Sequence, residues 1–284
     1  MDLNRALVAL VVGPVLIVAA YLGGWYFFVP LVLVLLAATS EYTRMITAMR
    51  HHAPRALLMP AVGLVLTAMA WAEYRVVSLV VFLAILALLV YCLWRFERGL
   101  TTDAASDWFA LVTGLVLLGW IGGHFFLLRR LPDDGLRWTL VAMLTIWAAD
   151  MGAYGVGSFL TGRVLGRHAL SPRLSPKKTV EGYIGGIIIG TGVALAVAAI
   201  LDVSLLLAGI CGLAVSVLGL FGDLSISLLK REAGMKDSGT LFASHGGALD
   251  RLDSLIWAGA IVYYLVVYLG PLLPPAGCGV PTAH

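Results

Sequence analysis

Long runs of apolar residues recur along the whole chain, and they restrict its fold more than any other feature of the sequence. Of the 284 residues, 61% are hydrophobic and only 12% are charged, whereas about a quarter of the residues of a soluble domain are charged. Short segments of alternating hydrophobicity, which a membrane β-barrel requires, are not seen. The sequence therefore predicts an all-α, polytopic integral membrane helical bundle without a soluble domain.

About nine membrane segments can be assigned to the apolar runs. Their predicted cores are 6–22, 25–40, 56–72, 76–94, 108–128, 138–159, 180–201, 204–229 and 254–270. Only Gly23 and Gly24 separate the first two segments, so we expect these to form a tight helical hairpin. The first run has one arginine before it and no small-residue cleavage site after it, so we expect a retained helix rather than a signal peptide.

The lysines and arginines are distributed unevenly over the loops. All but four lie at the N-terminus or in the loops that follow the second, fourth, sixth and eighth segments, and the four exceptions are Arg75, Arg129, Arg130 and Arg137. The positive-inside bias therefore predicts a cytoplasmic N-terminus, cytoplasmic loops at 160–179 and 230–253, and an external C-terminus. The net charge of +3 is slight and gives no indication of nucleic-acid binding.

The spacing patterns of several common sites are missing from the sequence. Cys92, Cys211 and Cys278 have neither pairing nor metal-ligand spacing, and we expect them to be small buried hydrophobic residues. Zinc-type clusters of cysteine and histidine, a P-loop and a GxGxxG fingerprint do not fit either.

The first polar constellation lies in the sixth predicted segment and centres on Asp150. An ionised carboxylate in an apolar segment is costly and usually functional. Tyr154 follows four residues later and should share a helix face with it. The surrounding small residues are Gly152, Gly155, Gly157 and Gly162. Close helix packing accounts for these glycines but leaves Asp150 unexplained, so we expect Asp150 to act in or beside a site.

The loop after that segment contains two Ser-Pro steps and a pair of lysines. Ser175 is predicted as the N-cap of the next helix and Pro176 as its first residue. Lys177 and Lys178 at a helix start oppose the helix dipole unless an anion binds there, so the loop predicts phosphate binding. Glu181 lies close enough in sequence to pair with Lys178. The alternative is a basic loop that contacts anionic lipid headgroups.

The densest polar stretch, 227–253, follows an apolar run that itself contains Asp223. On a helix, Asp223, Ser227 and Lys230 lie at i, i+4 and i+7, and therefore on one face. Asp250 and Asp253 share a face where the last segment begins.

Carboxylates from two helices with basic residues beside them suit a divalent cation and phosphate. His245, Gly246 and Gly247 form a turn in which the backbone can approach a ligand closely, and His245 could contact phosphate, act as a base or cap the helix. The alternative interpretation is a set of salt bridges within a charged loop.

These residues resemble the signature of a known family, the phosphatidate cytidylyltransferases, also called CDP-diacylglycerol synthases. The matching positions are Ser227, Leu229, Lys230, Arg231, Lys236, Asp237 and Gly239, followed by His245, Gly246, Gly247, Asp250, Arg251, Leu252 and Asp253. Upstream they are Asp150, Gly152, Ala153, Tyr154, Leu170, Ser171, Pro172, Ser175, Pro176, Lys177, Lys178, Thr179, Glu181 and Gly182. The specific similarity covers residues 145–257. Ala243 and Ala248 depart from the pattern beside the glycine turn, and Glu41 with Tyr42 resembles it outside this range.

The resemblance implies the reaction of CTP with phosphatidate to give CDP-diacylglycerol and pyrophosphate, in phospholipid biosynthesis at the inner membrane of a bacterial-type cell. It implies Mg2+, with two ions expected and a monovalent cation left open, held by Asp223 and Asp250. The other residues expected to be catalytic are Lys230, Arg231, Lys236, Asp237, His245, Arg251 and Asp253. Those expected to bind substrate are Asp150, Ser175, Lys177, Lys178, Thr179, Glu181, Ser227, Gly246 and Gly247.

On this interpretation the partners are CTP, phosphatidate and membrane lipid, with no nucleic acid, and a homodimer is left open. Residues 1–135 should form scaffold and lipid groove, and residues 136–284 the catalytic part. The rival interpretation is an ion-coupled carrier that uses Asp150 and Asp223 as coupling carboxylates. A carrier would not need lysine-rich loops beside them. The pattern of a CDP-alcohol phosphotransferase is missing.

Overall fold

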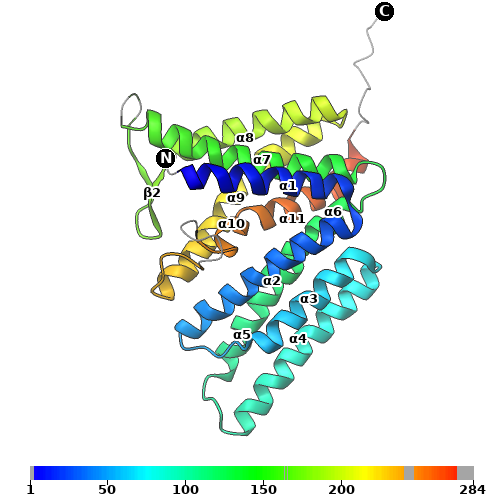
Figure 1. Ribbon diagram of the computed structural model, residues 1–284, viewed down its shortest axis with the longest axis vertical. Coiled ribbons are helices and arrows are strands. Elements are labelled where there is room, and N and C mark those ends of the chain that lie inside the picture. Colours follow the sequence, from blue (N-terminus) through cyan, green and yellow to red (C-terminus); the bar gives the residue numbers. More distant parts are fainter. Residues whose placement is uncertain (1–2, 163, 165, 240–245, 274–284) are drawn as a thin grey trace, which may run out of the picture. The chain divides into compact units, whose positions relative to one another are not determined.

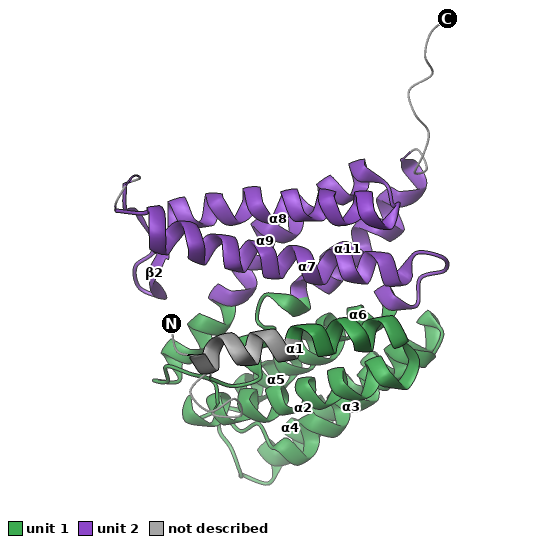
Figure 2. Ribbon diagram, turned by 45° about the horizontal axis from the view of Figure 1, so that its top comes forward, with its two compact units in different colours: residues 1–127, 225–256 green, residues 128–224, 257–284 purple. Residues whose placement is uncertain are grey.

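The computed structural model describes residues 3–162, 164, 166–239 and 246–273, with only the backbone described for 3–12 (Figure 1). The chain divides into two compact units, which are coloured separately in Figure 2. The first unit comprises residues 1–127 and 225–256, and the second comprises residues 128–224 and 257–284. Both units are therefore assembled from segments that are far apart in the sequence.

The first unit contains the N-terminal helices. They are α1 (Leu3–Leu22), α2 (Gly24–Ala48), α3 (Arg55–Trp71), α4 (Tyr74–Glu97), α5 (Ala104–Gly114), the π-helical η1 (Leu115–Ile121) and α6 (Gly122–Arg129), whose last two residues belong to the second unit. Gly23 and Gly24 have φ angles of 65° and 48°, a left-handed region that favours glycine. These two residues form the predicted tight connection of the first hairpin, and the α1–α2 contacts confirm that hairpin.

The remaining elements follow in chain order. They are α7 (Gly135–Gly155), the π-helical η2 (Val156–Leu160), β1 (Ala169–Ser171), β2 (Ser175–Thr179), α8 (Val180–Leu201), α9 (Leu205–Glu232), α10 (Leu249–Leu252), α11 (Leu255–Leu269) and the 3-10 helix η4 (Gly270–Leu272). The continuous helix α9 begins in the second unit and ends in the first, and α10 belongs to the first unit. α11 begins in the first unit and continues into the second.

The predicted all-α membrane bundle is confirmed. Within the described residues, 7 helices are long and apolar enough to cross a membrane, and each coincides with one of the predicted segments. The predicted segments 6–22 and 56–72 coincide with α1 and α3. Two further segments are apolar but shorter than these 7 helices. They are α3 and Gly13–Leu22, the part of α1 with described side chains. Cys92 and Cys211 are buried, as expected, and Cys278 lies outside the described residues.

The second predicted segment, 25–40, is too short. α2 continues through Ser40, Glu41, Tyr42 and Thr43 to Ala48, although hydropathy falls after Thr39. The polar turn is stable because it is buried in protein. The Tyr42 hydroxyl donates to the Ala110 carbonyl oxygen at 2.7 Å, and a Cβ at Gly114 would lie 2.5 Å from the Tyr42 ring. This anchoring against α5 fixes the turn of α2 that carries Glu41.

The predicted helix start at Ser175 and Pro176 is wrong. Residues Ser175–Thr179 form β2, which pairs antiparallel with β1 in a short hairpin. The helix begins at Val180 instead, and Thr179 is its N-cap. The Thr179 hydroxyl accepts a hydrogen bond from the Gly182 backbone N–H at 3.1 Å, which satisfies one of the free donors of the first turn.

Glycines allow α7 and α8 to pack closely in the second unit. Gly182, Gly186 and Gly190 lie four residues apart on α8 and are buried. A Cβ at Gly186 would lie 2.7 Å from the Ala149 carbonyl oxygen of α7 and 3.0 Å from the Ala153 Cβ. The two backbones are therefore too close for any side chain at this position.

We predict that Gly186→Ala destabilises the protein by about 1–3 kcal/mol, because the added methyl group overpacks the α7–α8 contact. Gly192→Ala is the matched control on the same helix, since a Cβ at Gly192 meets nothing within 4 Å. The control should unfold at the wild-type temperature or slightly above it. Thermal unfolding of both variants in detergent measures the difference, and equal midpoints would contradict the packing argument.

Candidate functional site

An ion pair joins the lysine loop to α9 within the second unit. Lys178 on β2 donates from Nζ to Oδ2 of Asp223 on α9, and both side chains are partly exposed. The expected pairing of Lys178 with Glu181 is wrong. Lys178 lies in an extended strand rather than in the first turn of a helix, so the three-residue spacing does not bring the two side chains together.

Glu181 interacts with His168, a residue that the sequence did not single out. Its Oε1 lies 2.5 Å from Nδ1 of His168, and the same carboxylate accepts from the His168 backbone N–H at 3.2 Å. Glu181 stands in the first turn of α8, where a negative charge is favoured by the helix dipole. The pair connects the start of α8 to the residue just before β1.

A second lysine–carboxylate pair lies in the first unit and involves Asp250. Lys230, near the end of α9, donates from Nζ to Oδ1 of Asp250 at 2.7 Å. The side chains of Lys230 and Asp250 are 14% and 11% exposed, so the pair is more buried than that of Lys178 and Asp223. A buried charge of this kind is stable only where its partner and further hydrogen bonds replace water.

The other oxygen of Asp250 accepts hydrogen bonds from residues that precede α10. Oδ2 accepts from the Ser238 backbone N–H and from the Ser238 hydroxyl, both at 2.9 Å, and from the Gly247 backbone N–H at 3.0 Å. Gly246 has a φ angle of 83°, and a Cβ there would lie 2.6 Å from the same oxygen. The glycine turn thus approaches one of the carboxylates of the chain itself.

Glu41 is the site residue that the sequence interpretation left without a role. It is 8% exposed, and its carboxylate accepts from the Ser238 hydroxyl at 2.8 Å and from the backbone N–H groups of Ala248 and Leu249 at 3.0 Å. One signal could have identified it. Glu41 closely follows an apolar run in a chain with few charges, and Asp150 and Asp223, which were singled out, lie within such runs.

The remaining predicted residues lie in varied surroundings. Ser227 is buried on α9, and the Asp253 carboxylate accepts from the Ser254 backbone N–H at 2.7 Å. Ser175 is half-buried on β2. The exposed residues are Asp150, Lys177, Arg231, Lys236, Asp237 and Arg251. His245 lies outside the described residues.

The donor atoms at these pairs suit magnesium. Among the described residues, no group of three or more histidine, cysteine, aspartate and glutamate side chains is arranged to hold a metal ion. Magnesium, however, commonly takes only one or two carboxylates and completes its shell with water and substrate phosphate oxygens. Asp223 and Asp250 offer hard oxygen donors, each with a lysine beside it. Their chemistry therefore fits the expected ion.

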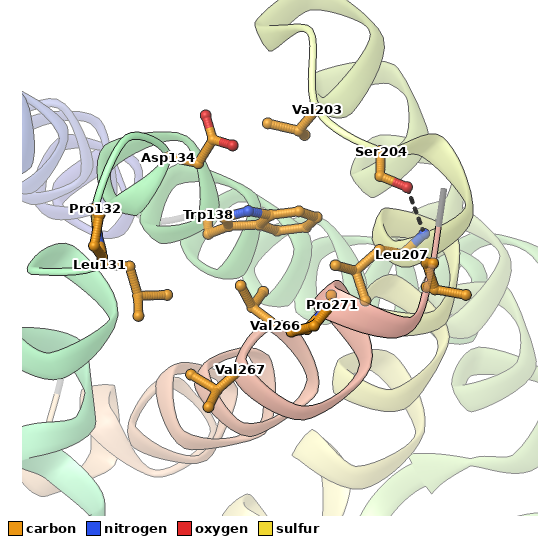
Figure 3. A pocket seen from close by; sticks show the side chains of 12 residues that line it. Leu131, Pro132, Asp134, Trp138, Val203, Ser204, Leu207, Val266, Val267 and Pro271 are labelled. Carbon is orange, nitrogen blue, oxygen red and sulfur yellow. Dashed lines mark hydrogen bonds between the residues drawn. The ribbon is translucent and has the colours of Figure 1, made fainter. Parts of the chain in front are cut away.

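A mainly apolar pocket of about 410 Å³ lies in the second unit, at the beginning of α7 and the end of α11 (Figure 3). Trp138 lines it together with Leu207, Val266 and Pro271. Asp134 and Ser204 are the polar side chains in its lining. None of the predicted site residues lines this pocket, so it is separate from the lysine–carboxylate pairs.

Comparisons with known proteins agree on one family. The model of the cytidylyltransferase family matches residues 3–269. A phosphatidate cytidylyltransferase of Synechocystis sp. is 33% identical over 280 residues, which cover 89% of this chain and 92% of the relative. The phosphatidate cytidylyltransferase of Staphylococcus saprophyticus is 37% identical over 157 residues, which cover 55% of this chain and 58% of the relative.

A further relative, the phosphatidate cytidylyltransferase of Staphylococcus aureus strain COL, is 36% identical over 156 residues, covering 54% of this chain and 58% of its own. The similarity to the Synechocystis protein extends over most of both chains, so it is not limited to the polar motifs. The resemblance seen in the sequence and the prediction of an enzyme of this type are thereby confirmed. With its membrane helices and its match over residues 3–269, this integral membrane protein belongs to the cytidylyltransferase family.

Proposed function

We propose that this chain makes CDP-diacylglycerol and pyrophosphate from CTP and phosphatidate. The observation that carries the proposal is the presence of two lysine–carboxylate pairs, Lys178 with Asp223 and Lys230 with Asp250, on residues of the polar motifs. Lysines next to carboxylates at the ends of membrane helices suit a reaction between a highly charged nucleotide and a charged lipid headgroup. Family membership and the names of the relatives support this choice of substrates.

The reaction needs one bond to form and one to break. A phosphate oxygen of phosphatidate attacks the α-phosphorus of CTP in line, the bond from that phosphorus to the bridging oxygen breaks, and pyrophosphate leaves with the electron pair. The attacking oxygen is already anionic near neutral pH, so no strong general base is required. Catalysis then rests on positioning the reactants and neutralising their charge.

The basic residues of the chain supply much of that charge. Carboxylates hold the ammonium groups of Lys178 and Lys230, and we propose that both lysines bind phosphate oxygens of the substrates. The exposed Arg231, Lys236 and Arg251 lie on the same polar stretch and can attract the triphosphate and the lipid phosphate. Thr179 and Glu181 shape the start of α8 beside the lysines.

Magnesium is the proposed cofactor, with Asp223 and Asp250 as the carboxylates that would each take part in holding it and two ions as the expected number. When bound, the ion neutralises negative charge on the reacting phosphates and on the leaving pyrophosphate. Neighbouring hydrogen bonds, such as those from Ser238 and Gly247 to Asp250, keep the carboxylate oriented.

The proposed orientation places this chemistry in the cytoplasm, where CTP is made. It is supported by the excess of lysine and arginine in the loops 160–179 and 230–253. The carrier interpretation is less well supported, because Lys178 pairs with Asp223 and the relatives bear the names of enzymes.

The purified protein with labelled CTP, phosphatidate and Mg2+ is expected to form a lipid-soluble CDP product and pyrophosphate in equal amounts. Removal of Mg2+ with a chelator should stop the reaction, and readdition should restore it. A related enzyme assayed in the same detergent and lipid serves as the positive control. If that control turns over and this chain does not, the proposed function is wrong.

Asp223→Asn should lower kcat by roughly 10²–10³-fold, since the neutral amide would hold Mg2+ less well and the charge of the reacting phosphates would be less neutralised. Asp202→Asn is the matched control, the same substitution at the exposed end of α8. Asp202 has a φ angle of 54°, which asparagine also tolerates. Thermal unfolding should be similar for both variants. Wild-type turnover by Asp223→Asn would refute its proposed role.

A further inference from the structure

We propose that Glu41 is a positioning residue for Asp250, a role that rests on the function proposed above. Glu41 comes from α2, far in sequence from Asp250, yet the two residues belong to the same compact unit. We place it outside the set of residues proposed to contact substrate or metal. Its action passes through the backbone and through Ser238 to Asp250.

The first part of the argument is the environment of the carboxylate. Glu41 is almost fully buried, and its two oxygens divide the available donors between them. Oε1 accepts from the Ala248 N–H, and Oε2 accepts from the Leu249 N–H and the Ser238 hydroxyl. The two N–H groups lie where α10 begins, so they have no acceptor within that helix. Glu41 therefore fixes the start of the short helix that carries Asp250.

The second part is the bridge through Ser238. The Ser238 hydroxyl lies 2.8 Å from Oε2 of Glu41 and 2.9 Å from Oδ2 of Asp250. A hydroxyl has one hydrogen and so donates to one carboxylate at a time, while the Ser238 N–H continues to hold Asp250. The Arg44 guanidinium donates to the Ser238 carbonyl oxygen. Ser238 is thus held on its backbone and its side chain, and with it one side of Asp250.

The third part is steric. A Cβ at Gly239 would lie 2.1 Å from Oε1 of Glu41, and a Cβ at Gly247 would lie 2.1 Å from Oε2. The three nearest atoms to each of these positions all belong to Glu41. Glycine at positions 239 and 247 lets the backbone approach this one carboxylate closely at both places. The arrangement requires Glu41 as much as it requires the glycines.

These contacts determine the direction in which Asp250 presents its remaining oxygen. Oδ2 is engaged with Ser238 and Gly247, which leaves Oδ1 for Lys230 and for any ligand. If Glu41 is lost, the N–H groups of Ala248 and Leu249 lose their acceptor and the turn can rotate. Asp250 would then still be present but would no longer be held in one orientation.

The test compares Glu41→Ala and Glu41→Gln with the exposed control Glu97→Gln. Glu41→Ala should lower kcat roughly 10- to 100-fold, the usual cost of losing an orienting partner, and should raise the Mg2+ concentration for half-maximal activity. The KM for CTP should change little. Glu41→Gln keeps one acceptor oxygen and should be intermediate, and the control should match wild type.

Hydrogen–deuterium exchange gives a readout that does not depend on turnover. The amides of Ala248 and Leu249 should exchange faster in both Glu41 variants and at the wild-type rate in Glu97→Gln. If exchange and kcat per folded molecule are unchanged, Glu41 has no positioning role. If wild type itself makes no CDP-diacylglycerol, the proposed function fails, and exchange alone still decides whether Glu41 holds the turn.

Gly239→Ala provides a second route, should Glu41→Ala not fold. The new methyl group meets Glu41 and should displace its carboxylate, with the same loss of kcat and the same faster exchange at Ala248. In a double-mutant cycle with Glu41→Gln, the two losses should be clearly less than additive, since both act on one set of hydrogen bonds. Full additivity would contradict the proposal.

Discussion

A carboxylate buried in a membrane protein has to find donors within the protein, and the described site depends on this constraint. Burying an unpaired charge costs several kcal/mol. Glu41 meets this requirement with backbone N–H groups and a hydroxyl, and Asp250 meets it with Lys230 and the donors of Ser238 and Gly247. The same partners that make burial tolerable also fix the direction of each carboxylate, so stabilisation and orientation of the site have one physical origin.

Much of the fold could be predicted because apolar runs of membrane length have few alternatives to a helix. The charged residues within or beside these runs were equally visible. Contacts between distant segments were not: Lys178 is separated by 45 residues from Asp223, and local spacing suggested Glu181 instead. The end of α2 was missed for a related reason, since hydropathy records a polar turn but not the protein that buries it.

Glycine serves two different purposes in this chain. On α8, Gly186 lets two helices approach until backbone and backbone are in contact. At Glu41, Gly239 and Gly247 let the backbone come close to a side chain. Sequence alone showed that glycines were frequent near the polar motifs. It did not show whether an added methyl group would meet a neighbouring backbone, as at Gly186, or a carboxylate, as at Gly239 and Gly247. Only the packing around each position distinguishes them.

The separation of Glu41 from its donors has a consequence for biogenesis. Ser238, Ala248 and Leu249 follow Glu41 by 197, 207 and 208 residues. At a synthesis rate of about 5–20 residues per second, α2 would wait roughly 10–40 s at the ribosome before these partners are made. During that interval its carboxylate lacks these donors and has to be protonated or hydrated instead. The hydrogen bonds from Ser238, Ala248 and Leu249 therefore reach Glu41 only late in synthesis, long after its own helix has been made.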